Sequence, residues 1–287
     1  MEELGFARVD IGRGRRRGHP EAVYCEGKTV AEVVAIARSL VGSGAENVLA
    51  TRASDETLGA LRAAFPGTVV HERARLAVLA PAARSGTGRV DVVCGRPEDE
   101  PAAEEAALVA EAMGSRVVRR YDAPVHDPAA LPGWLGLGLG EQDAPAVFVV
   151  ADGTGGALPT LVSGLVDRMV IALPTSAGGA LPGRAALLSA LNSCSPGVVA
   201  VNIDNGYGAG YSAHMINAPN ATTNPPTTTA TNAAPAALAA PAALAANAAL
   251  AANAANDAPA ANAAPNATAA DAAAGGDVVS VVDAGAV

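Results

Sequence analysis

Hydrophobic residues in the first part of the chain switch between helical and strand-like spacing. After Thr29, apolar residues recur at intervals of three and four, which predicts a helix that ends near Gly42. Thr29 and Glu32 also have the spacing of a capping box at the start of that helix. The same reading predicts three further elements, which are a strand at 47–51, a helix at 54–65 and a strand at 68–71. Together these elements predict a small α/β domain over residues 1–87.

The next part of the chain repeats one unit, a buried strand followed by a turn or loop and a helix. Strands are expected at 89–94, 116–121, 147–151, 169–173 and 198–203. Helices are expected at 101–113, after the glycine-rich turn at 153–156, and in the segment that ends near Cys194, while a glycine-rich tail is expected after 203. Strands that alternate with helices are typical of a parallel sheet with helices on both faces. We therefore expect a flavodoxin-like, doubly wound, three-layer domain over residues 88–217.

Residues 218–287 have a different composition. They consist mainly of Ala, Asn, Pro and Thr, without aromatic residues and almost without charge. Such a segment buries too little apolar surface to offset the entropy of ordering it, so we expect it to be disordered.

Composition and charge exclude several classes of function. A formal net charge of −9 argues against general binding to nucleic acids, which favours a basic surface. No apolar run is long enough to suggest a membrane span, and the acidic first residues do not suggest a signal peptide. The 3 cysteines lie far apart without zinc-type spacing, as expected for reduced thiols in the cytoplasm.

Charged and glycine-rich segments supply candidates for ligand binding. Arg13 begins a cluster of arginines that is either a solvated basic stretch or a clamp for a phosphate or carboxylate. Asp99 and Asp122 follow predicted strands, at the edge where parallel sheets bind ligands, although helix capping or simple solvation would also explain them. The glycine-rich turn at 153–156 leads into a predicted helix whose first N–H groups suit a phosphate.

Several motifs resemble one known family in their order and spacing across roughly residues 5–217. They read GFARVD, RRGHPEAVYCEGKT, LATR, DEPAAEEAALVAEAMG, RRYD, GGALPTLVSGLVD, VIALPTS, ALLSALNSC and VNIDNGYGAGY. By these motifs the chain resembles the LarB family, whose second domain is similar to aminoimidazole-ribonucleotide carboxylase (PurE-like). The resemblance implies carboxylation of the pyridinium ring of nicotinic acid adenine dinucleotide by CO2. It also implies hydrolysis of the phosphoanhydride with release of AMP, on the route to the nickel-pincer nucleotide of lactate racemase.

The resemblance also implies roles for particular residues. The cysteine of the NSC motif, Cys194, is the implied nucleophile that adds to the ring, and Asp99 is the second catalytic candidate. Asp122 is the candidate ligand of a Mg2+ ion that would neutralise the pyrophosphate. The implied substrate-binding residues are Gly153, Gly155, Gly156, Ala157, Thr175, Ser176, Asn192, Ser193 and Arg13. A homo-oligomer is implied as well, because PurE-like domains assemble with sites near their subunit contacts.

This sequence departs from the family pattern inside the same motifs. Gly155 stands where family members carry a glutamate, in the turn that usually reads GMEGALP. Arg96, Pro97 and Glu98 replace small residues that let a ligand approach the backbone before Asp99. Two alternatives therefore accompany the LarB-type enzyme: a member that binds the nucleotide with weakened or no turnover, and a PurE-like aminoimidazole-ribonucleotide carboxylase.

Overall fold

The computed structural model describes residues 1–84, 86–137, 144–178 and 181–218. Contacts group Met1–Thr227 into one compact unit and Thr228–Val287 into another. The predicted disorder after residue 217 therefore falls almost wholly outside the described residues. The predicted domain boundary near residue 87 stays a prediction.

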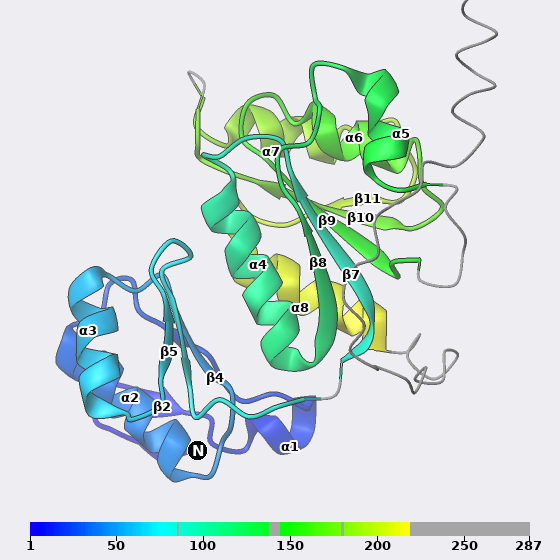
Figure 1. Ribbon diagram of the computed structural model, residues 1–287. Coiled ribbons are helices and arrows are strands. Elements are labelled where there is room, and N and C mark those ends of the chain that lie inside the picture. The colour runs from blue at the N-terminus through cyan, green and yellow to red at the C-terminus, as the bar shows by residue number, and fades with distance from the viewer. Residues whose placement is uncertain (85, 138–143, 179–180, 219–287) are drawn as a thin grey trace, which may run out of the picture. The chain divides into compact units, whose positions relative to one another are not determined.

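The first part of the chain forms a 4-stranded sheet in the order β3-β4-β6-β5. Its strands are β3 (Val23–Tyr24), β4 (Val48–Thr51), β5 (Val69–His71) and β6 (Leu76–Leu79). Two helices cover one face, α2 (Val30–Gly42) and α3 (Asp55–Ala64), as Figure 1 shows. The capping box of Thr29 and Glu32 is confirmed, and Ser54 caps α3 by accepting a hydrogen bond from the Thr57 N–H.

Five elements in this part were not expected from the sequence, and one of them is the edge strand β3. The strand β6 pairs with both β4 and β5, and so completes the sheet. The arginine cluster forms the short helix α1 (Arg13–Arg17), which ends at Gly18 in the left-handed conformation. A small antiparallel ribbon of β1 (Glu2–Glu3) and β2 (Arg8–Val9) precedes it.

The second part contains the expected parallel sheet of 5 strands, in the order β11-β10-β9-β7-β8. The strands are β7 (Thr87–Cys94), β8 (Ser115–Arg120), β9 (Val147–Asp152), β10 (Met169–Pro174) and β11 (Val198–Ala200). Numbered within the sheet alone, this is the flavodoxin-like order, so the predicted fold class is confirmed. The last strand is shorter than the predicted 198–203.

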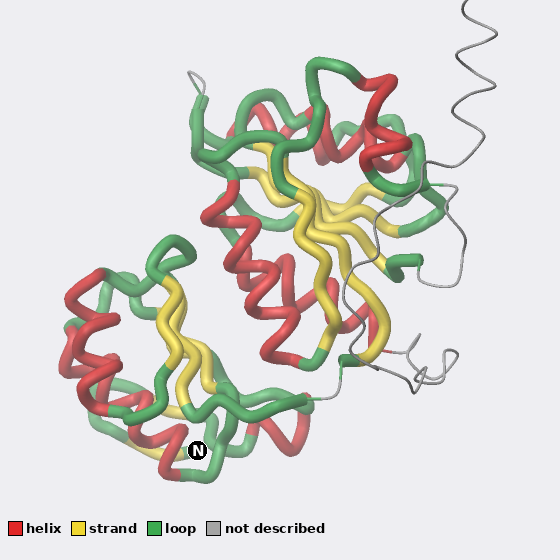
Figure 2. The backbone as a smooth tube through the Cα atoms, in the orientation of Figure 1, coloured by secondary structure: helices red, strands yellow, loops and turns green. Residues whose placement is uncertain are grey.

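Helices lie on both faces of this sheet (Figure 2). Alternate side chains of its strands pack against them. On one face, α4 (Glu100–Met113) and α8 (Gly206–Asn217) cover residues such as Val92 and Val149. On the other face, α5 (Leu131–Trp134) and α6 (Ala157–Ser163) cover Phe148 and Val150. In the described residues of this part, the remaining helices are the short 3-10 turn η1 (Pro128–Ala130) and α7 (Arg184–Leu191).

The glycine-rich segment after residue 203 was expected to be a tail, and this prediction is wrong because the segment forms α8. Glycines suit this helix since it packs closely against α4. A Cβ added at Gly206 would lie 2.5 Å from the Ala102 carbonyl oxygen, and one at Gly210 would lie 2.3 Å from that of Ala106. Small residues there let the two helix backbones approach.

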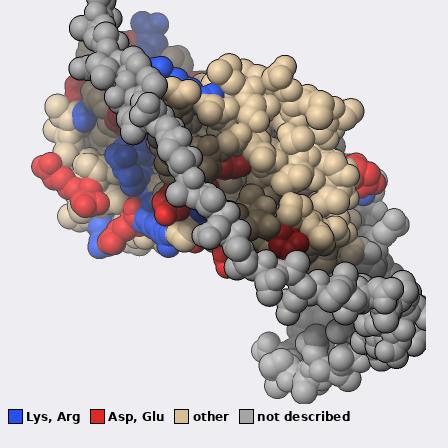
Figure 3. Space-filling view, turned by 90° about the horizontal axis from the view of Figure 1, so that it is seen from above, with Lys and Arg blue, Asp and Glu red and all other residues tan. Residues whose placement is uncertain are grey.

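A separate apolar cluster joins the face of the 4-stranded sheet that α2 and α3 leave open to α4. Leu49, Leu76 and Val78 of the sheet pack with Leu108 and Met113 of α4. Among the described residues, no helix is long and apolar enough to cross a membrane. Figure 3 shows charged side chains of both signs gathered on one part of the surface beside a wide area that carries few.

Candidate functional site

The candidate site lies where the strand order of the 5-stranded sheet reverses direction, between β7 and β9. The neighbouring strands β7 and β9 lead into α4 and α6, which cover opposite faces of the sheet. In doubly wound sheets, this point at the carboxyl edge opens a crevice for a ligand. The loops after β7, β9 and β10 meet here, and they carry Asp99, Gly153 and Thr175.

Asp99 is the centre of this edge and is only 1% exposed. Its Oδ1 accepts a hydrogen bond of 2.5 Å from the Thr175 hydroxyl, and its Oδ2 lies 3.3 Å from Nε of Arg96. The backbone N–H of Gly153 also donates to its carboxylate. Three separate loops thus hold one buried carboxylate in place.

Burial raises the pKa of Asp99 above its ordinary value. The hydrogen bond from Thr175 and the charge of Arg96 oppose that rise, while the nearby carboxylate of Asp152 adds to it. Arg96 also donates to the Ala177 carbonyl at 3.2 Å, so its side chain bridges the loops after β7 and β10. In this chain an arginine fills the place where the family pattern has small residues.

The turn after β9 is shaped by close contacts. Asp152 accepts hydrogen bonds from the N–H groups of Thr154, at 3.0 Å, and Leu158, at 3.1 Å, and so closes the start of α6. A Cβ at Gly153 would lie 2.2 Å from the Thr175 hydroxyl, which requires glycine there. Gly156 has a φ of +69°, and a Cβ there would lie 2.8 Å from the Ala186 carbonyl.

Gly155, in contrast, stands in open space. A Cβ added there meets no atom within 4 Å. Its φ is also outside the left-handed region. Neither backbone nor packing therefore requires a glycine at the position where the family pattern has a glutamate.

The loops after β10 and β11 are joined by Asp204. Its Oδ1 accepts the N–H of Ser176 at 2.8 Å, and its backbone carbonyl accepts a hydrogen bond of 3.0 Å from Arg52. Arg52 comes from the end of β4, and its guanidinium also pairs with Glu26 at 3.0 Å. The 4-stranded sheet thus supplies a side chain that holds the site's outer loop.

Asp122 lies at the carboxyl end of the edge strand β8, is exposed and has a φ of +65°. Asp99, the second carboxylate that follows a strand at this edge, already binds Thr175 and Arg96. Among the described residues, no three His, Cys, Asp or Glu side chains are grouped so that they could hold a metal ion. This donor set does not form a metal cage of its own; Mg2+ would fit only as an ion carried by the phosphates of a substrate, with Asp122 as a single ligand.

Cys194 differs sharply from the other two cysteines. Cys25 and Cys94 are buried, and burial raises their pKa to about 11 and about 12, which makes them poor nucleophiles. Cys194 is exposed. It is therefore the thiol that a substrate can reach.

Cys194 lies, as the sequence predicts, between a helix and a strand. These are α7 and β11, so Cys194 belongs to the amino edge of the sheet. Two bonds confirm this placement: the Gly197 carbonyl accepts the N–H of Val170 at the start of β10, and the Pro196 carbonyl accepts the hydroxyl of Ser163 at the end of α6. Within one chain, α7 runs between the two edges, and its Ser189 hydroxyl donates to the Gly156 carbonyl of the turn after β9 at 3.3 Å.

The remaining candidate residues also lie in different places, at the amino edge, at the carboxyl edge or in α1. Asn192 and Ser193 accompany Cys194 at the amino edge, where the Ser193 hydroxyl is 2.9 Å from that of Thr160. Ala157 begins α6 at the carboxyl edge. Arg13 lies in α1 and lines a different pocket with Asp10, Arg16 and Arg17.

Sequence reasoning missed Arg52 and Asp204 as parts of the site. Each follows a predicted strand directly, which is the same signal that singled out Asp99 and Asp122. Both are also non-glycine residues in the left-handed region, with φ of +53° and +54°. The sequence does not reveal that second signal.

Comparisons with known proteins identify the family of the chain. A family model described as the LarB/PurE-like N-terminal domain matches residues 1–81. The "Uncharacterized protein MJ0165" of Methanocaldococcus jannaschii is 32% identical over 216 residues, which cover 73% of this chain and 83% of that protein. That similarity extends well beyond the domain matched by the family model. The chain therefore belongs to the LarB/PurE-like family.

Proposed function

We propose that the protein carboxylates the pyridinium ring of nicotinic acid adenine dinucleotide with CO2 and cleaves its phosphoanhydride, releasing AMP. The product is the pyridinium-3,5-biscarboxylate mononucleotide that precedes the nickel-pincer nucleotide of lactate racemase. The observation that carries the proposal is Cys194, an exposed thiol in the NSC motif while both other thiols are buried. Family membership and the polar carboxyl edge around Asp99 support it.

The chemistry explains why an accessible thiol is needed. A pyridinium ring is electron-poor and does not attack CO2. When the Cys194 thiolate adds to the ring, the ring gains an enamine-like carbon that forms a bond to CO2. The new sp³ carbon then loses its proton, and the C–S bond breaks to return the thiolate and restore the aromatic ring.

The carboxyl edge would hold the rest of the substrate. The turn at 153–156 and the loop at Thr175 and Ser176 lie beside Asp99, and Thr154, Gly155 and Ser176 are their exposed residues, to which the substrate would bind. A Mg2+ ion bound to the pyrophosphate would neutralise charge during hydrolysis. To Asp99, which Thr175 and Arg96 hold, we assign the role of orienting a water or accepting a proton.

Because Cys194 and Asp99 lie at opposite edges of one sheet, we propose that each site combines the two residues from two copies of the chain. The surroundings of Cys194 support such an assembly. Leu188 and Leu191 of α7 are 65% and 67% exposed, and Val199 beside them is 42% exposed. Exposed leucines in a row beside a nucleophile favour a surface that another subunit covers.

The test is incubation of the purified protein with nicotinic acid adenine dinucleotide, bicarbonate and Mg2+, followed by mass spectrometry. We expect AMP and a mononucleotide with one additional carboxylate, and loss of that product in Cys194→Ser. Aminoimidazole ribonucleotide is tested in parallel. Binding of the dinucleotide without product, or turnover of the purine precursor alone, would overturn the proposal.

A further inference from the structure

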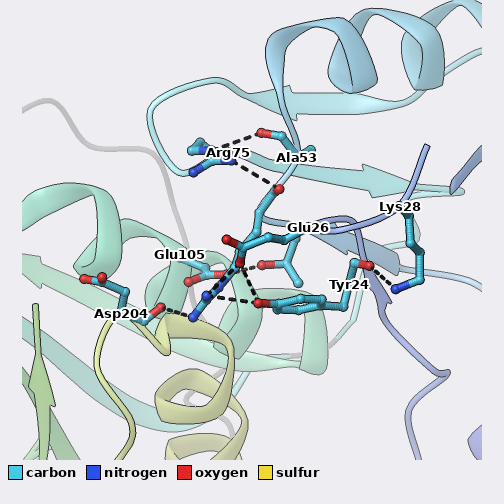
Figure 4. Close-up of polar contacts among 9 residues, drawn as sticks. Tyr24, Glu26, Lys28, Ala53, Arg75, Glu105 and Asp204 are labelled. Carbon is cyan, nitrogen blue, oxygen red and sulfur yellow. Dashed lines mark hydrogen bonds and ion pairs between the residues drawn. The ribbon is translucent and has the colours of Figure 1, made fainter. Parts of the chain in front are cut away.

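A pocket of about 290 Å³ lies beside the candidate site and is lined by three arginines. We call it the arginine pocket. Its main lining residues are Arg52, Arg73, Arg75, Glu26, Ser176 and Asp204. Figure 4 shows Arg75, Glu26 and Asp204 around it, together with Tyr24 and the buried Glu105.

The arginines of this pocket are not consumed by buried ion pairs. Arg75 donates to the carbonyls of Ala53, at 3.1 Å, and Arg52, at 3.4 Å, and among the described residues no carboxylate pairs with it. The side chain of Arg73 is 58% exposed, and it pairs with Glu100 at the pocket's outer side. At least one guanidinium therefore keeps donors for a bound anion.

The backbone around the pocket is held in an unusual conformation. Arg52, Arg75 and Asp204 have φ of +53°, +50° and +54°, in the left-handed region that side chains seldom adopt. Such residues cost free energy and cluster at functional sites. In each case the strained backbone belongs to a residue whose side chain or carbonyl lines the same pocket.

The arginine pocket adjoins the candidate site through Ser176. Ser176, which lines it, directly follows Thr175, whose hydroxyl binds Asp99. The Asp204 carboxylate accepts the Ser176 N–H through Oδ1. A molecule bound at Asp99 and long enough to pass Ser176 would therefore enter the arginine pocket.

We propose that the arginine pocket binds the adenosine 5′-phosphate half of the dinucleotide, with the arginines on the phosphate and Glu26 and Asp204 on ribose hydroxyls. This inference rests on the proposed function. Both kinds of charge in the lining fit a nucleotide, because guanidinium groups bind phosphate in a forked geometry and carboxylates accept hydrogen bonds from a ribose diol. The pocket volume of about 290 Å³ lies at the lower end of the range for small-molecule sites, which is about 300–1,000 Å³. It therefore suits half of a dinucleotide better than the whole molecule.

The experiment measures binding of AMP and of inorganic pyrophosphate by calorimetry to the full chain. The variants are Arg75→Gln, Arg73→Gln and the double variant, with Arg62→Gln as the matched control. Arg62 lies on α3, is 60% exposed, pairs only loosely with Glu72 at 3.8 Å and does not line the pocket. Thermal melting of each variant checks that it folds.

We expect AMP to bind about tenfold more weakly to each single pocket variant, and more weakly still to the double variant. The Arg62→Gln control should bind as the wild type does. An unchanged AMP affinity in a folded double variant would overturn the inference, as would an equal loss in the control. Absence of AMP binding by the wild type would overturn it too.

Kinetic measurements distinguish a failure of the pocket assignment from a failure of the proposed reaction. If the protein turns over the dinucleotide and the KM is unchanged in Arg75→Gln, the pocket assignment fails while the proposed function stands. If there is no turnover but AMP affinity falls in the pocket variants, the pocket stands and the reaction is wrong. A rise in KM with unchanged kcat would support both.

Discussion

The two edges of the 5-stranded sheet carry opposite kinds of surface. At the carboxyl edge, Asp99 is buried and held by Thr175 and Arg96, and the arginine pocket lies next to it. At the amino edge, Cys194 is exposed beside the exposed side chains of Leu188 and Leu191. One edge offers prearranged polar groups and the other offers a nucleophile among apolar side chains.

Neither edge alone carries both the nucleophile and the polar groups that the proposed chemistry needs. Parallel strands collect the loops that bind ligands at their carboxyl ends, so the proposed dinucleotide would bind at the Asp99 edge. Under the proposed function, the thiol at the other end of the same sheet would serve the site of a different copy. The following predictions test that division, beginning with the largest effect.

The strongest test is complementation between two inactive variants. Cys194→Ala and Asp99→Asn should each lose about 10²-fold or more of the activity. If each site takes Asp99 from one chain and Cys194 from another, random mixed oligomers should recover about a quarter of the wild-type sites. Co-expression with two affinity tags, followed by product assay of the doubly purified protein, measures this recovery.

Failure of the mixture to recover any activity would contradict a shared site. The control is co-expression of Cys194→Ala with itself under both tags, which should stay inactive. A second control co-expresses the wild-type chain with a chain that carries both Cys194→Ala and Asp99→Asn. It measures the activity of sites that contain no altered residue.

The second prediction concerns the apolar surface of α7. Leu188→Asp with Leu191→Asp should dissociate the oligomer, because each leucine buried in an interface contributes roughly 1.5–3 kcal/mol. Light scattering during size-exclusion chromatography would show a smaller species, and activity should fall with it. Val69→Asp is the control, since Val69 is 44% exposed on the separate 4-stranded sheet. An unchanged mass for the leucine variant would show that this surface is not the interface.

The third prediction restores a carboxylate to the turn after β9. Gly155→Glu should fold normally because its Cβ meets open space, and it should raise turnover by up to about 10²-fold by supplying an acid–base group. The rate of product formation under saturating dinucleotide measures the gain. Gly156→Glu is the contrasting variant, because its φ of +69° and its contact with Ala186 should cost roughly 1–3 kcal/mol of stability. A Gly155→Glu protein that is less active than the wild type would contradict this.

The smallest effect is expected from Thr175→Val. The variant removes a donor to the Asp99 carboxylate, so the pKa of Asp99, already raised by burial, should rise further. The acid limb of the pH–rate profile should move to higher pH by roughly one unit or less. Thr175→Ser keeps the hydroxyl and should leave the limb in place.

The same pKa shift predicts the sign of a stability effect. A carboxyl whose pKa is raised in the folded state binds more protons there than in the unfolded chain, so stability falls as pH rises from the ordinary pKa to the folded one. In Thr175→Val that window should extend to higher pH. Urea unfolding in steps from pH 4 upward, pH 4 being roughly the ordinary pKa of an aspartate, measures it, and a wild-type-like profile would contradict the role given to Thr175.

Much of the fold follows from local patterns in the sequence. The run of apolar residues in β9 and β10 and the helical spacing after Thr29 predict their elements because each buried strand or helix face repeats with a fixed period. The glycines of α8 misled the prediction, since their role is to allow contact with α4, and that contact lies between residues distant in sequence.

The candidate site, like the fold, could be predicted from the sequence only in part. Local patterns predict the parallel α/β class, the family motifs, the polar residues that follow the strands and the place of Cys194 between a helix and a strand. The folded chain alone shows that Thr175 and Arg96 hold Asp99 and that Arg52 and Asp204 meet at one pocket. The physical reason is that strand order and helix crossing set which loops share an edge, and these arise from packing between distant segments.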